Sequence, residues 1–71
     1  MTSRPLLRAK IAERGVLMKH LAEKCGISAV AFSSKIRGRS EFTLAEAAVL
    51  RSELSLSDGE FLTIFFADEV A

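Results

Sequence analysis

The sequence predicts an all-α domain of five short helices, and three kinds of local signal support this. Glycines follow the first three helical segments, hydroxyl residues precede the last three, and apolar residues recur three or four positions apart. No segment has the pattern of a strand. A chain of 71 residues has the size of one small domain, so we expect residues 1–71 to form a single unit.

The first three helices are expected over residues 5–14, 18–25 and 29–37. Each ends near a glycine that can adopt the left-handed conformation, namely Gly15, Gly26 and Gly38. Pro5 suits the first turn of the first helix, and Ser28 can cap the third. The residues expected to face inward are Leu7 and Ile11, then Leu17, Leu21, Ala22 and Cys25, and then Phe32 and Ile36.

The last two helices have the clearest starting signals. Thr43 with Glu46, and Ser57 with Glu60, each form a capping box, in which a hydroxyl and a carboxylate three residues later bind each other's free backbone N–H. These signals predict helices over residues 44–54 and 58–67. The glutamates of these last two helices, together with Asp68 and Glu69, are interpreted as caps and solvated charge.

Charge is distributed unevenly along the chain, although the net charge is only +1. Nine basic and two acidic residues precede Glu41, whereas one basic and seven acidic residues occur from Glu41 onward. The N-terminal part is therefore a candidate surface for a polyanion. The alternative is a dipolar protein whose charges only keep it soluble.

The run LAEKCGIS at residues 21–28 contains the features needed to join two helices at a tight corner. Ala22 is small enough for a close approach of the next helix, Gly26 permits the turn, and Ile27 fills the corner. Residues 16–38 resemble the helix-turn-helix of the Cro and lambda-repressor family, and the five-helix order is similar across nearly the whole chain. The resemblance implies a compact lambda-repressor-like domain whose second and third helices form the helix-turn-helix.

The same resemblance implies a sequence-specific DNA-binding regulator, of the repressor or Cro type, that places its third helix in the major groove of double-stranded DNA. By position, the residues that would face base edges are Ala29, Val30, Ser33 and Ser34. Those that would contact phosphate are Met18, Lys19, Lys35, Arg37, Arg39 and Ser40. We expect such a protein to act in the cytoplasm of a bacterium or of a phage-infected host.

Four residues depart from the family pattern and leave a second interpretation open. Leu17 and Met18 stand where a Ser or Thr cap and a glutamine are common, and Ala29 and Val30 stand at the first two reading positions. Base readout would then depend on thymine methyl groups, serines and DNA shape. Alternatively, this surface binds a protein, and the chain is a modulator or antirepressor that pairs with a partner repressor.

The fifth helix has apolar residues on more than one face. Phe61 and Phe65, four positions apart, are predicted to lie in the core. Leu62 and Phe66 form a second stripe, which is a candidate homodimer or partner interface, the alternative being that both are buried in a monomer. The oligomeric state measured by sedimentation distinguishes the two.

Nothing in the sequence favours an enzyme, a cofactor, a metal site or a small-molecule ligand. His20 is the only histidine and is predicted to lie on a solvated helix beside Glu23 and Lys24. Cys25 is the only cysteine and is interpreted as a small buried apolar residue. The glycines are isolated rather than gathered in a phosphate-binding loop, and no apolar run has the length of a membrane span.

Overall fold

The computed structural model describes residues 2–68, and these form five α-helices and no strand. The helices are α1 (Arg4–Arg14), α2 (Met18–Cys25), α3 (Ala29–Ile36), α4 (Leu44–Glu53) and α5 (Asp58–Phe65). The predicted all-α class is confirmed. The longest helix has 11 residues, and within residues 2–68 none has the length and apolarity needed to cross a membrane.

Six of the ten predicted helix boundaries match the observed ones, and the other four differ by one or two residues. Arg4 is already helical because Ser3, in an extended conformation, is the N-cap of α1. Arg37 and Leu54 are C-caps and so lie just outside α3 and α4. The predicted end of the fifth helix is wrong by two residues, because the backbone of Phe66 leaves the helical region (φ −128°, ψ 41°).

Four of the helices end in the same hydrogen-bonded turn. After α3, the N–H of Gly38 donates to the carbonyl of Lys35, and the N–H of Arg39 donates to the carbonyl of Ser34, which is the Schellman arrangement. The residue at the turn has positive φ: Gly15 (68°), Gly26 (73°), Gly38 (82°) and, after α4, Ser55 (52°). Ser55 could not be identified from the sequence because serine gives no signal for a left-handed backbone.

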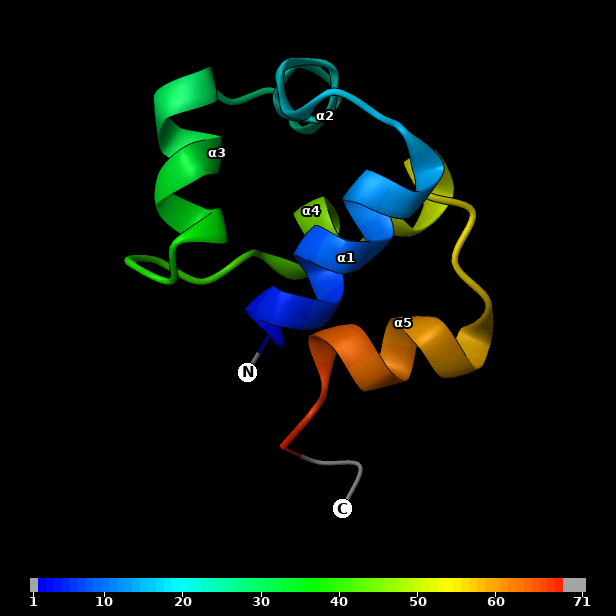
Figure 1. Ribbon diagram of the computed structural model, residues 1–71. Helices are drawn as coiled ribbons and strands as arrows, with labels where there is room; N and C mark the ends of the chain where they lie inside the picture. The colour runs from blue at the N-terminus through cyan, green and yellow to red at the C-terminus, as the bar shows by residue number, and fades with distance from the viewer. Residues whose placement is uncertain (1, 69–71) are drawn as a thin grey trace.

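The core is assembled from all five helices and the loop before α5. Its buried apolar residues are Leu7, Ile11, Leu21, Ala22, Phe32, Ile36, Ala47, Leu50, Leu54, Leu56, Ile64 and Phe65. α2 packs against both α3 and α4, and α1 packs against α5 (Figure 1). The radius of gyration is 11.0 Å, which is the value of about 11 Å expected for a compact chain of this length.

Three residues predicted to face the core are less buried than expected. Leu17 is 73% exposed, because it is the extended N-cap of α2 and therefore does not share the helical face of Leu21. Cys25 and Phe61 pack against the core but are only half-buried. The Phe61 ring contacts that of Phe65 at 5.3 Å between centroids.

Both capping boxes are present, and each glutamate also binds a lysine from another helix. Glu46 accepts the backbone N–H of Thr43 at 2.8 Å and the ammonium of Lys35 at 2.6 Å, which joins α3 to α4. Glu60 accepts the N–H of Ser57 at 2.9 Å and the ammonium of Lys10 at 2.6 Å, which joins α1 to α5. The prediction that the acidic residues are solvated is wrong for Glu46, which is 8% exposed. Glu69 lies outside the described residues.

Two glycine substitutions are predicted to change the stability of the fold in opposite directions. A Cβ at Gly26 or at Gly59 would meet no atom within 4 Å, but Gly26 has φ +73° whereas Gly59 lies in α5. We expect Gly26→Ala to destabilise the protein by about 1–2 kcal/mol and Gly59→Ala to stabilise it by about 0.5–1 kcal/mol. Urea unfolding measures the free energy of unfolding of both variants. Equal changes in the two variants would contradict the explanation from backbone conformation.

The Lys10–Glu60 contact is predicted to make stability depend on acidic pH. The hydrogen bond from Lys10, aided by the N–H of Ser57, lowers the pKa of Glu60 from 4.5 to about 2. The stabilisation is therefore complete above about pH 5 and is lost as the pH falls toward 2. Glu60→Gln keeps a capping side chain but removes the charge.

We accordingly expect the urea midpoint of Glu60→Gln to lie below that of the parent at neutral pH, and the difference to narrow between pH 5 and 2. Glu23→Gln is the control, because Glu23 is exposed and makes no ion pair among the described residues. A difference that stays constant over this pH range would show that the charge on Glu60 is not responsible.

Candidate nucleic-acid interface

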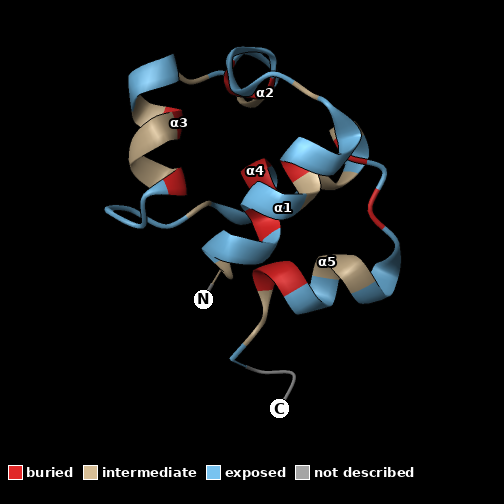
Figure 2. Cartoon of the chain, in the orientation of Figure 1, coloured by how far each residue is buried: buried red, intermediate tan, exposed pale blue. Residues whose placement is uncertain are grey.

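The outward face of α3 and the turn that follows it form the candidate site. α3 begins at Ser28, whose hydroxyl accepts the N–H of Ala31 at 3.0 Å. Phe32 and Ile36 are 1% and 2% exposed and fix one face of the helix on the core. The helix must therefore present its opposite face outward, as Figure 2 shows.

Six residues predicted to contact DNA lie around one shallow depression of about 360 Å³ on this face. Its lining consists of Ala29, Val30, Ser33, Ser34, Arg37 and Arg39. All four predicted base-facing residues are among them, together with two of the predicted phosphate contacts. Val30 is 78% exposed, and the two serines are half-buried.

The turn after α3 holds the two arginines at the edge of this depression. Arg37 is the C-cap of the helix, and Gly38 places Arg39 at the next position of the Schellman turn. Neither arginine has a carboxylate within 4.0 Å among residues 2–68. Both guanidinium groups are therefore free to bind an anion.

The structure does not bring the remaining predicted phosphate contacts to the depression. Met18 and Lys19 are exposed in the first turn of α2, and Ser40 is exposed one residue beyond Arg39, but none of them lines it. Figure 1 shows α2 viewed along its axis and α3 viewed from the side, so the two helix axes cross steeply.

The prediction that Lys35 contacts phosphate is wrong, because its side chain faces the interior rather than solvent. Only 14% of the side chain is exposed, and its ammonium lies 2.6 Å from Glu46 Oε1 and 5.9 Å from the centroid of the Phe42 ring. Although burial acts to raise the pKa of Glu46, the hydrogen bond from Lys35 and the backbone of Thr43 bring that pKa below its ordinary value. We therefore remove Lys35 from the phosphate-contacting set.

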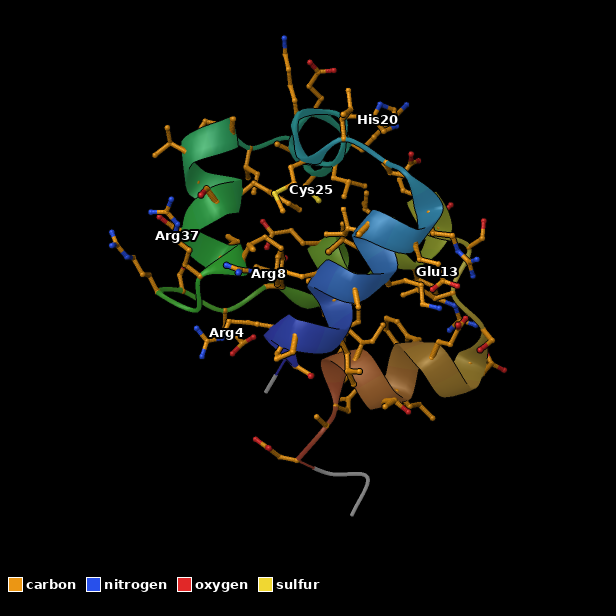
Figure 3. All side chains as sticks on the ribbon, viewed as in Figure 1. Arg4, Arg8, Glu13, His20, Cys25 and Arg37 are labelled. Carbon is orange, nitrogen blue, oxygen red and sulfur yellow. The ribbon has the colours of Figure 1, made fainter. Side chains whose placement is uncertain are left out.

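Two arginines that were not singled out in the sequence lie next to the site. Arg4 donates a hydrogen bond to the carbonyl of Arg37, and its guanidinium lies against Gly38. Arg4, Pro5 and Arg8 line a second depression, of about 440 Å³. Figure 3 shows Arg4 below the loop that follows α3, on the same side of the molecule as Arg37, and Arg8 between α1 and the lower end of α3. Only folding could reveal this proximity, because 33 residues separate Arg4 from Arg37.

The other basic residues of α1 are paired with acidic residues on the opposite side of the molecule. Lys10 lies 2.8 Å from Glu13 and 2.6 Å from Glu60, and Arg14 donates to the carbonyl of Leu54 at 2.9 Å. Figure 3 shows Glu13 on the side away from Arg4 and Arg37. Arg4, Arg8, Arg37 and Arg39, by contrast, have no acidic partner among residues 2–68.

The only histidine and the only cysteine have different surroundings, because His20 is exposed and Cys25 is half-buried. His20 binds Glu53 of α4 at 2.8 Å rather than being simply solvated on α2, so this link was missed from the sequence. Burial raises the pKa of the Cys25 thiol, which disfavours the reactive thiolate. Within the part of the chain that the structure describes, no group of three His, Cys, Asp or Glu residues could hold a metal ion.

The two residues proposed for an interface on α5 differ in exposure. Leu62 is 47% exposed, whereas Phe66 is half-buried, lies against the core and contacts the Phe61 ring edge-on at 5.8 Å between centroids. Leu62 is therefore the member of this pair that presents an apolar surface. The two side chains do not form one exposed stripe.

Comparison with known proteins adds no assignment, since no protein-family model, no curated protein and no solved structure matches this chain. The fold and the site thus define a five-helix, all-α protein with a basic surface around its third helix.

Replacing Lys35 is predicted to separate its structural role from a role in binding. Lys35→Met leaves the Glu46 carboxylate buried without its partner, so we expect a loss of about 2 kcal/mol in the free energy of unfolding. If the protein binds a polyanion, the dependence of that binding on salt should remain that of the parent. Chemical unfolding measures the loss of stability, and a binding titration measures the salt dependence. A reduced salt dependence would show that Lys35 does contact phosphate.

Proposed function

We propose that the chain is a DNA-binding transcriptional regulator, of the repressor or Cro type, that uses α2 and α3 as a helix-turn-helix. The single observation that carries the proposal is the depression on the outward face of α3, lined by two short polar residues, two small apolar residues and two unpaired arginines. A helix held by its apolar face, with short side chains outward, can approach base edges closely in the major groove.

The roles of the lining residues follow from their chemistry. Arg37 and Arg39 supply affinity for phosphate, which is the same for every sequence. The Ser33 and Ser34 hydroxyls can donate to or accept from base edges, and Ala29 and Val30 can contact thymine methyl groups. None of these four residues makes the bidentate contacts of arginine, asparagine or glutamine. The proposed readout is therefore modest in sequence specificity and sensitive to DNA shape.

Salt-dependent binding to a duplex tests this function. We expect the purified protein to bind a fluorescent random-sequence duplex, and its affinity to fall on the order of 10²-fold between about 50 and 200 mM salt if roughly four phosphates are contacted. Fluorescence anisotropy measures both affinities. An absence of binding at about 50 mM salt would contradict the proposal.

The double variant Arg37→Ala/Arg39→Ala tests the residues. It should weaken binding to all duplexes alike and lower the slope of log affinity against log salt by about 2. Lys24→Ala is the matched control, since it removes a positive charge from α2 at a position that does not line the depression. Unchanged binding by the double variant would exclude these arginines as phosphate contacts.

The exposure of Val30 favours a second candidate function. Val30 is 78% exposed and Met18 is 42% exposed, which is a high exposure for apolar side chains on a helix-turn-helix. Such a surface suits a modulator that pairs with a partner repressor. The same titration discriminates between the two functions, because a protein-binding modulator would not bind the duplex at low salt.

A further inference from the structure

We propose that Arg4 and Arg8 of α1 form a second phosphate-binding site, so that one DNA duplex contacts α1 as well as α3. This inference rests on the proposed function and deepens it by adding residues and a helix that the resemblance did not assign. It starts from the second depression, which Arg4, Pro5 and Arg8 line and which lies next to the turn after α3.

The first argument is the charge pattern of α1. Arg4 and Arg8 are four residues apart, so both side chains lie on one face of the helix, where two like charges destabilise it by about 0.2–0.5 kcal/mol. The nearby carboxylate of Glu41 accepts the backbone N–H of Thr2 at 3.2 Å and makes no ion pair with either arginine among the described residues. This pair therefore has no acidic partner among the described residues and is available to an anion from outside the protein.

The second argument is the contrast with the other basic residues of the same helix. Lys10 and Arg14 have acidic partners from α1 and α5, and these ion pairs lie on the far side of the molecule. Charges that serve only solubility need not be sorted in this way. In α1, however, the paired residues Lys10 and Arg14 lie on one side, and Arg4 and Arg8, which have no acidic partner in residues 2–68, lie on the other. The division leaves Arg4 and Arg8 on the same side as Arg37 (Figure 3).

The third argument is the contact that joins the two depressions. Arg4 donates one of its five N–H groups to the carbonyl of Arg37, at the negative end of α3, and its guanidinium lies over Gly38. The contact holds the turn that carries Arg37 and Arg39 and leaves further N–H groups of Arg4 for a phosphate. Arg4 thus has a positioning role in addition to its own contact.

The occupant is a DNA backbone rather than an isolated anion because the basic groups are spread over two elements. Arg8 and Arg4 lie on α1, and Arg37 and Arg39 lie on the turn after α3, so the four arginines line two adjoining depressions. A single phosphate can be held by one guanidinium fork, whereas successive phosphates of a strand require such a spread.

Arg8→Ala is the main test because Arg8 is exposed and its side chain has no hydrogen bond or ion pair in residues 2–68. We expect the variant to unfold as the parent does, to lose about tenfold in duplex affinity near 0.1 M salt, and to lower the salt slope by about 1. Arg8→Lys keeps the charge and should retain the slope. Lys24→Ala is the charge-matched control for a general effect of net charge.

Arg4→Ala should lower the slope further and also weaken the contribution of Arg37 and Arg39, so a double-variant cycle between Arg4 and Arg37 should show coupling. If the parent binds with a strong salt dependence but Arg8→Ala and Arg4→Ala bind as the parent does, the second site is wrong and the proposed function stands. If the parent does not bind a duplex at low salt, both are wrong.

Discussion

The arrangement of the helices depends on two glutamates that cap their own helix and bind a lysine from another. Glu46 caps α4 and binds Lys35 of α3, and Glu60 caps α5 and binds Lys10 of α1. In each contact a lysine ammonium lies near the N-terminus of a helix, which carries a partial positive charge. The glutamate carboxylate lies between the two and binds both. These pairs join α3 to α4 and α1 to α5, whose apolar residues pack into the shared core.

This arrangement also determines the charge on the surface. The lysines and arginines that hold helices together are neutralised by the acidic second half of the chain, so they contribute little to the external field. The basic residues left without an acidic partner among residues 2–68 include Arg4, Arg8, Arg37 and Arg39, which lie at the two depressions. The small net charge therefore conceals a concentrated positive face.

Local signals in the sequence were sufficient for the secondary structure and for part of the candidate site. The capping boxes at Thr43 and Ser57 and the glycines after α1, α2 and α3 placed the helices, because these signals act within a few residues. The four predicted base-facing residues do lie together, since a single helix with one buried face fixes which side chains point outward. Whether DNA occupies that face remains a proposal.

The sequence by itself determined the class of fold, the positions of the helices and the outward stripe of α3, since each depends on hydrogen bonds or periodicity within one segment. Only the tertiary structure decided which charged side chains form ion pairs or hydrogen bonds. Lys35 turned inward because α4 placed Glu46 beside it, His20 found Glu53, and Arg4 reached the carbonyl of Arg37 across 33 residues. Such contacts depend on how helices pack, and no local pattern encodes which charge will meet a partner.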